Sequence, residues 1–190
     1  MGLPALKLAT YEDYAALPDD GRRHELIEGR LLEVPAPLTE HQRGGGNLSF
    51  AFRTYVRQHR LGEVFEAPID VILDAHDTVQ PDLVFVAREH SDRISRRGIE
   101  GAPDLVVEIL SESTASRDCI EKRALYERTG VPEYWIVDPA ARSITVLVLD
   151  AAGRYGIHSK AAADEAVRSR AFPEIEVVPG PLFDAPRYDE

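Results

Sequence analysis

The chain has 190 residues, of which 44% are hydrophobic, and these values fit one globular domain with a sizeable core. Its net charge of −11 argues against a protein that binds nucleic acid through a broadly basic surface. Cys119, the single cysteine, excludes an internal disulfide and a zinc site built on thiolates. No apolar stretch is long enough to span a membrane and no secretion signal is recognisable, so we expect a cytoplasmic protein.

The first residues predict a short helix followed by a hairpin. Thr10 is typical of a helix start, and the helix is expected to end near Leu17. Polar and apolar residues alternate in 24–28 and 30–34, which predicts two strands joined by a tight turn. The acids of this hairpin, Glu25 among them, are expected to be exposed.

A longer helix is expected next, and it should end near Arg60. Its apolar residues repeat at helical spacing and are Leu48, Phe52, Tyr55 and Val56. Its start is open, because the three glycines at 44–46 would each cost about 1 kcal/mol inside a helix. The helix begins either near Thr39 or after the glycines, with Asn47 as its cap.

The middle of the chain predicts strands and a charged loop. Residues 63–73 predict one or two strands, and 82–86 predict another that begins at Pro81-Asp82. Segment 88–101 is charged and is expected to form a loop with a short helix. Its arginines lie close in sequence to further basic residues and offer a local basic face. The full set is Arg88, Arg93, Arg96, Arg97, Arg117, Lys122 and Arg123.

Residues 101–139 form the unit around which the rest of the chain is expected to assemble. After Asp104, segment 104–110 is apolar except for Glu108, which predicts a strand covered on both faces. An ionised carboxylate in such a strand is costly, so Glu108 requires a lysine, an arginine or a metal ion as its partner. A helix at 117–129, which carries Lys122, and a strand at 133–137 follow.

The C-terminal part is expected to complete the sheet. Residues 143–149 and 154–159 predict two strands, and segments 171–173 and 175–178 are expected to close the sheet. No internal repeat or long linker interrupts the chain. We therefore expect a single domain over 1–190, with a core of about 10–183.

Motifs spread along nearly the whole chain, from Thr10 to Phe183, occur in a joint order and spacing. They are RHELIEGRL at 23–31, His41, Pro81-Asp82, APDLVVEILS at 102–111, Asp118, Lys122 and Tyr126, and GVPEYWIVDP at 130–139. Together they resemble the Uma2-like restriction endonuclease family, a branch of the PD-(D/E)XK nuclease superfamily. The resemblance implies one α/β domain of the restriction-endonuclease-like kind, with a mixed central sheet flanked by helices.

The resemblance also implies an activity and a site. The implied activity is Mg²⁺-dependent hydrolysis of DNA phosphodiester bonds by an endonuclease, with Mn²⁺ able to replace Mg²⁺. Asp82, Glu108 and the backbone carbonyl of Ile109 would hold the ion. Lys122 would be the catalytic lysine, and His41 an accessory contact to substrate or metal-bound water. Because the chain is acidic, we expect weak binding to random duplex DNA. A homodimer is a further expectation.

Plainer interpretations stay open beside this one. Asp82 alone is typical of the start of a strand, and Glu108 of a buried salt bridge to Lys122 or an arginine. Lys122 also fits a pair with Asp118 on a solvated helix face. The alternative functions are a non-catalytic binding module on the same fold, and a metal-dependent phosphodiesterase acting on RNA or a small phosphate ester.

Two further expectations concern Asp104 and Leu110. Asp104 also follows a proline, but in a strand its Cα would lie roughly 13 Å from that of Glu108, too far to share an ion. The superfamily places a lysine two residues after the glutamate, where this chain has Leu110. We therefore expect Lys122 to point into the cleft between Asp82 and Glu108. Lys122→Met should reduce cleavage while sparing the fold, and Leu110→Lys should partly restore cleavage.

Overall fold

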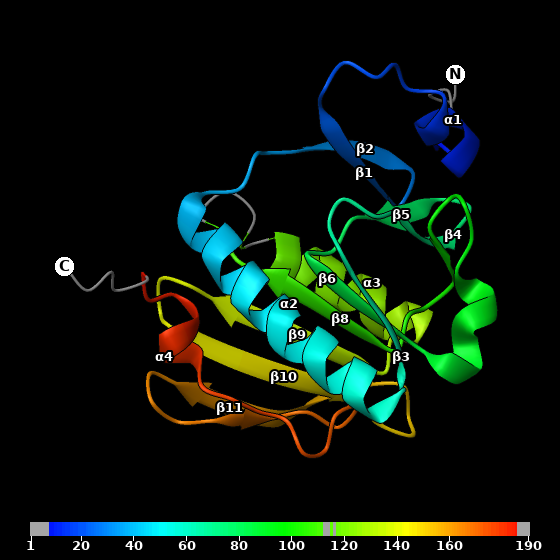
Figure 1. The fold of residues 1–190 in the computed structure, drawn as a ribbon. Helices are drawn as coiled ribbons and strands as arrows, with labels where there is room; N and C mark the ends of the chain where they lie inside the picture. The colour runs from blue at the N-terminus through cyan, green and yellow to red at the C-terminus, as the bar shows by residue number, and fades with distance from the viewer. Residues whose placement is uncertain (1–7, 112–114, 116, 186–190) are drawn as a thin grey trace.

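Two sheets and the helices around them make up the part of the chain that the computed structural model describes, residues 8–111, 115 and 117–185 (Figure 1). The larger sheet has six strands in the order β11-β10-β9-β8-β6-β3. Their bounds are Tyr155–Ala162 (β11), Ser143–Leu149 (β10), Glu133–Asp138 (β9), Leu105–Ile109 (β8), Leu83–Ala87 (β6) and Gly62–Glu66 (β3). Strands β8 and β9 are parallel and the other pairs are antiparallel, so the sheet is mixed, as predicted.

A smaller sheet has five strands in the order β2-β1-β5-β4-β7. Their bounds are Arg30–Val34 (β2), Arg23–Ile27 (β1), Asp77–Val79 (β5), Val71–Asp74 (β4) and Ile99–Glu100 (β7). The predicted hairpin is β1 and β2, and it turns at Glu28 and Gly29, which both have positive φ. This sheet brings β1 beside the segment that leads into β6.

The prediction that residues 171–178 close the main sheet is wrong. Strands β12 (Val167–Arg168) and β13 (Glu176–Val177) form a separate two-stranded ribbon. Between them, Phe172 packs its ring against Phe52 and Phe85 at centroid distances of 5.1 and 4.8 Å. The aromatic residue of this segment therefore fills the core over the sheet instead of extending the sheet.

The helices lie on both faces of the main sheet and at its ends. They are α1 (Tyr11–Ala15), α2 (Thr39–His59), a 3-10 helix η1 (Arg88–Arg93), a π-helix η2 (Arg117–Lys122), α3 (Arg123–Thr129) and α4 (Pro179–Leu182). Helix α1 is capped by Thr10, which forms a reciprocal capping box with Asp13, as predicted from their spacing.

Helix α2 takes the earlier of the two predicted starts, at Thr39, and includes all three glycines. Packing explains two of them. A Cβ at Gly44 would overlap the ring of Phe183, and a Cβ at Gly45 would lie 3.1 Å from Cδ1 of Ile109. Glycine here lets α2 approach α4 and the end of β8, which offsets its low helix propensity.

Strand β8 is buried on both faces, as predicted, and its alternation assigns its residues to two layers. Val107 and Ile109 face α2 and belong to one core cluster with Phe52 of that helix. Val106 faces the opposite layer, which contains Tyr126 of α3. Figure 1 shows α2 in front of the sheet and α3 behind it. Because side chains alternate along a strand, Glu108 lies on the α3 side.

Candidate active site

Asp82 lies directly before β6 and caps the end of the neighbouring strand. Its Oδ2 accepts a hydrogen bond of 2.7 Å from the backbone N–H of Ile109, the last residue of β8. Nε2 of His41, from the first turns of α2, lies 3.2 Å from the same oxygen. Asp82 thus lies at a strand start, as the plainer interpretation predicted. Its other carboxylate oxygen, Oδ1, binds neither of these two donors.

Asp82 and Glu108 lie at the same end of the β6–β8 pair. The two strands are antiparallel and pair Leu83 with Val107, the residues that follow Asp82 and precede Glu108. Both side chains line one cavity. The two predicted metal ligands are therefore close to each other in the fold.

Glu108 is buried and forms two short hydrogen bonds. Its Oε1 accepts from Nζ of Lys122 at 2.9 Å and from the hydroxyl of Tyr126 at 2.6 Å. Burial raises the pKa of Glu108 well above its usual value; the charge of Lys122 opposes this shift, and the neighbouring acids add to it. Both donors use the same oxygen, so neither occupies Oε2.

Lys122 joins two buried carboxylates. Its Nζ lies 2.9 Å from Oε1 of Glu108 and 2.7 Å from Oε1 of Glu25, and its side chain is only 5% exposed. Asp118, four residues earlier in the same π-helix, is 3.8 Å away. Burial alone would lower the pKa of Lys122, but the acids around it raise the pKa above its usual value. The lysine is therefore held as a cation.

Glu25 is a residue of the candidate site that the sequence interpretation did not include among the site residues. It was expected to be exposed, yet it is 1% exposed in β1. Its Oε1 accepts from the backbone N–H of Gln80 at 2.8 Å as well as from Lys122. Leu26 and Ile27 follow it on opposite faces of the strand and are both buried. A single acid beside apolar residues on both faces is the signal that also marks Glu108, and it could have identified Glu25.

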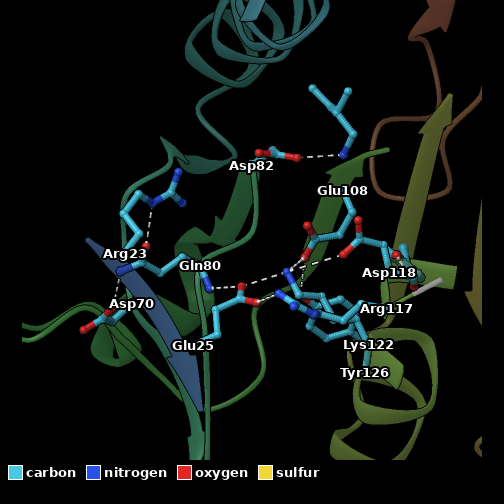
Figure 2. Close-up of polar contacts among 12 residues, drawn as sticks. Arg23, Glu25, Asp70, Gln80, Asp82, Glu108, Arg117, Asp118, Lys122 and Tyr126 are labelled. Carbon is cyan, nitrogen blue, oxygen red and sulfur yellow. Dashed lines mark hydrogen bonds and ion pairs between the residues drawn. The ribbon is translucent and has the colours of Figure 1, made fainter. Parts of the chain in front are cut away.

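These side chains surround one small cavity of about 50 Å³. Figure 2 shows them converging from β1, the start of β6, β8 and the π-helix. The lining includes four acids, Glu25, Asp82, Glu108 and Asp118, and four basic side chains, Arg23, His41, Arg117 and Lys122. Dense charge of both signs at a largely buried place is typical of a catalytic or binding site.

His41 connects Asp82 to the end of β8. Burial lowers the pKa of His41, but hydrogen bonding to Asp82 and the charge of that carboxylate outweigh burial, and the backbone of Ile109 adds to the effect. The net result is a raised pKa for His41. The raised pKa favours the protonated ring of His41 next to Asp82.

Comparison with known proteins identifies the family. The family model described as "Uma2: Putative restriction endonuclease" matches residues 11–180. The chain belongs to the Uma2 family. A search of curated proteins finds no match. Among solved structures, the crystal structure of a putative nuclease belonging to DUF820 from Anabaena variabilis ATCC 29413 is similar, with a TM-score of 0.75. It is 20% identical in sequence, and the match covers 92% of this chain and 97% of the other.

Among the predicted residues of this Uma2 protein, Asp82, Glu108, Lys122, His41 and Ile109 all line the cavity. Their catalytic and metal-binding roles stay predictions. Asp104 and Leu110 do not line it.

Asp104 lies at the opposite end of β8, where Oδ2 accepts the backbone N–H of Ala87 at 2.7 Å. It is a residue of a strand start, as predicted. Leu110 lines a neighbouring hollow together with Pro139 and Ala140. In this Uma2 protein Lys122 brings an ammonium to Glu108 from the following helix.

The predicted basic face does not form as one patch. Lys122 is buried in the site, whereas Arg97 forms a surface ion pair of 2.8 Å with Glu100. Arg93 donates to the backbone carbonyl of Ala102, and Arg88 is exposed near Asp104, at the far end of β8. Basic residues close in sequence thus serve separate parts of the fold.

The contacts of Lys122 lead us to expect that Lys122→Met destabilises the fold, contrary to the expectation from the sequence. The variant would leave Glu25 and Glu108 buried without the cation that joins them. Removing one partner of a buried ion pair is strongly destabilising, because the remaining charge is not compensated. Lys122 is therefore a structural residue of the site as well as a catalytic candidate.

Proposed function

We propose that this Uma2 protein is a Mg²⁺-dependent endonuclease that hydrolyses DNA phosphodiester bonds. One observation carries the proposal: Asp82 and Glu108 line one cavity at the same end of β6 and β8, and the ammonium of Lys122 lies 2.9 Å from Glu108 there. Family membership and the nuclease-like fold support a nuclease. The metal and the DNA substrate are the proposed parts.

The residues present fit a hard divalent cation. Mg²⁺ prefers oxygen ligands and keeps several waters, so two carboxylates and one carbonyl suffice. Asp82, Glu108 and the carbonyl of Ile109 would supply them. In the described part of the chain, no three His, Cys, Asp or Glu side chains are arranged to hold an ion, so the backbone oxygen is needed. When bound, the ion would polarise a phosphoryl oxygen and lower the pKa of a bound water.

The chain's own residues would orient the reacting groups. Lys122, kept charged by Glu25 and Glu108, would stabilise the negative charge that develops on the phosphate. Tyr126 fixes one oxygen of Glu108 through its hydroxyl. The N–H of Ile109 fixes one oxygen of Asp82. Both carboxylates are thus positioned before any ligand arrives, which reduces the ordering cost of binding.

Affinity for DNA is expected to be weak and modestly dependent on salt. The net charge is −11, and the basic residues do not form one face. Few phosphates would be neutralised, and the slope of affinity against salt follows that number. Targeting to a DNA site would therefore depend on local features of the cavity or on a partner.

The test combines metal binding with cleavage. Mn²⁺ binding is measured by calorimetry, and cleavage of plasmid DNA is measured with Mg²⁺, for the wild type and Glu108→Gln. The amide keeps the shape and loses the charge. We expect the wild type to bind the ion and nick DNA, and Glu108→Gln to do neither. A wild type that binds neither ion nor DNA would instead favour the non-catalytic module, and cleavage of RNA alone would change the substrate.

A further inference from the structure

Arg117 lies beside Lys122 because the helix between them is a π-helix. In an α-helix with 3.6 residues per turn, residues five apart point about 140° away from each other. In the wider π-helix the backbone bond joins residues five apart, so Arg117 and Lys122 lie on the same side of η2 (Arg117–Lys122). Figure 2 shows both side chains reaching toward Glu25. Such π-helical turns are frequent at functional sites.

The contact between Arg117 and Glu25 is incomplete. Nη1 of Arg117 lies 3.9 Å from Oε2 of Glu25, within reach of charge attraction but too far for a hydrogen bond. Both atoms are buried, and within the described ranges neither has a hydrogen-bond partner. Buried polar atoms without partners are costly and uncommon. The other oxygen of Glu25 is already bound by Lys122 and Gln80, so Glu25 holds Arg117 only loosely.

The other cations of the cavity are committed to protein groups. Arg23 donates from Nε to Gln80 at 2.9 Å, and Lys122 joins Glu25 and Glu108. Within the part of the chain that is described, Arg117 is the cation of the cavity with a buried N–H that lacks an acceptor. Its side chain remains 22% exposed, so solvent reaches part of it.

We propose that Arg117 binds the phosphate group of the substrate. Its guanidinium would donate to a non-bridging oxygen of a phosphodiester while Lys122 and the two acids hold the reacting centre. A planar guanidinium fits phosphate through paired hydrogen bonds, and it is always charged. A rotation of the guanidinium toward the cavity would give Nη1 the acceptor that it lacks. The inference rests on the proposed nuclease function for its substrate, but phosphate binding can be measured without turnover.

The test measures affinity for inorganic phosphate in the presence of Mg²⁺ by calorimetry. Arg117→Gln removes the charge and the planar fork. Arg123→Gln is the matched control, because Arg123 is exposed, follows directly on the next helix and does not line the cavity. We expect the affinity of Arg117→Gln to fall by about tenfold or more, and that of Arg123→Gln to equal the wild type. Equal affinity in the wild type and Arg117→Gln, or no binding by the wild type, would overturn the inference.

Cleavage of a DNA oligonucleotide separates this inference from the proposed function. We expect Arg117→Gln to raise KM for the oligonucleotide. If phosphate binding depends on Arg117 but the wild type cleaves no DNA, the inference is supported and the proposed nuclease function is contradicted. If Arg117→Gln fails to fold, a wild-type crystal soaked with phosphate and Mg²⁺ tests the inference instead. A phosphate within about 2.7–3.2 Å of the Arg117 guanidinium is expected, and a phosphate bound only elsewhere would contradict it.

Discussion

The two ends of the β6–β8 pair carry the same local motif in different surroundings. A proline precedes both Asp82, before β6, and Asp104, before β8. Asp82 accepts the backbone N–H of Ile109, the last residue of β8, and Asp104 accepts that of Ala87, the last residue of β6, each at 2.7 Å. Each aspartate also contacts a histidine: His41 at 3.2 Å and His90 at 2.8 Å. Local sequence alone therefore does not distinguish the two ends.

The difference lies in what the rest of the fold brings to each end. Beside Asp82 stand Glu108 and Lys122, both buried. Near Asp104 the basic residues Arg88 and Arg170 are exposed. A Pro-Asp strand start with a histidine is thus a structural motif of this sheet. Glu133, which lines the hollow at the Asp104 end, is also buried, but it accepts hydrogen bonds from Trp135, Ser169 and two backbone N–H groups instead of a lysine. The two ends therefore differ in that Lys122 joins two buried acids at the Asp82 end.

The largest difference that we expect between the two ends is in their contribution to stability. Lys122→Met is expected to lower the free energy of unfolding by about 3–5 kcal/mol, because two buried carboxylates lose their cation. Arg88→Met removes a cation at the exposed end and should change the free energy of unfolding by less than about 0.5 kcal/mol. Urea unfolding at neutral pH measures both.

A second variant tests the cause of that destabilisation. Adding Glu108→Gln to Lys122→Met removes one of the two unpaired charges and should recover part of the stability. If the double variant is as unstable as the sum of its single variants, charge burial is not the cause. If Lys122→Met is as stable as the wild type, the two ends of the strand pair do not differ as described.

The next effect is on metal binding and cleavage. Asp82→Asn and Asp104→Asn both keep an oxygen that can accept the backbone N–H, so both should fold. Asp82→Asn removes a proposed metal ligand, and cleavage with Mg²⁺ is expected to fall by about a hundredfold or more. Asp104→Asn should leave Mn²⁺ affinity and cleavage nearly unchanged. Equal losses in the two variants would show that the effect comes from the strand start and not from the metal.

Much of the fold was predictable because its signals are local. The apolar residues around Glu108 predict a strand buried on both faces, and the Thr10–Asp13 spacing predicts a helix cap. The Glu108–Lys122 pair also follows from local reasoning, since a buried acid requires a cation. Residues whose neighbours lie nearby in sequence were therefore placed well.

What could not be predicted depends on contacts between distant segments. Glu25 was expected to be exposed, because alternation in a hairpin suggests one solvated face, whereas Gln80 and Lys122 cover it. The π-helix was not anticipated, because the residues of 117–122 do not distinguish it from an α-helix. The approach of Asp82 to Glu108 depends on the register of β6 against β8, which the tertiary fold sets.

The smallest effect concerns pH and again compares the two ends. Ion binding requires Glu108 to be ionised, and its raised pKa makes affinity fall as the pH drops through that value. The pKa of His41 is raised as well, so its positive charge next to Asp82 is lost only as the pH rises through that raised pKa. Both shifts act in the same direction, and affinity for Mn²⁺ should increase with pH.

His41→Gln removes a ring whose protonated form opposes the ion, and it should therefore bind Mn²⁺ more tightly than the wild type below the raised pKa of His41, with a weaker pH dependence. One proton released on binding changes affinity by at most about tenfold per pH unit, which sets the size of the difference. His90→Gln, the matched change beside Asp104, should follow the wild-type curve, because His90 lies at the end without Glu108 and Lys122. Calorimetric titrations with Mn²⁺ between about pH 6 and pH 9 measure all three proteins. The same pH dependence in His41→Gln and the wild type would mean that His41 does not influence the ion, and that the two histidines serve only to fix their strand starts.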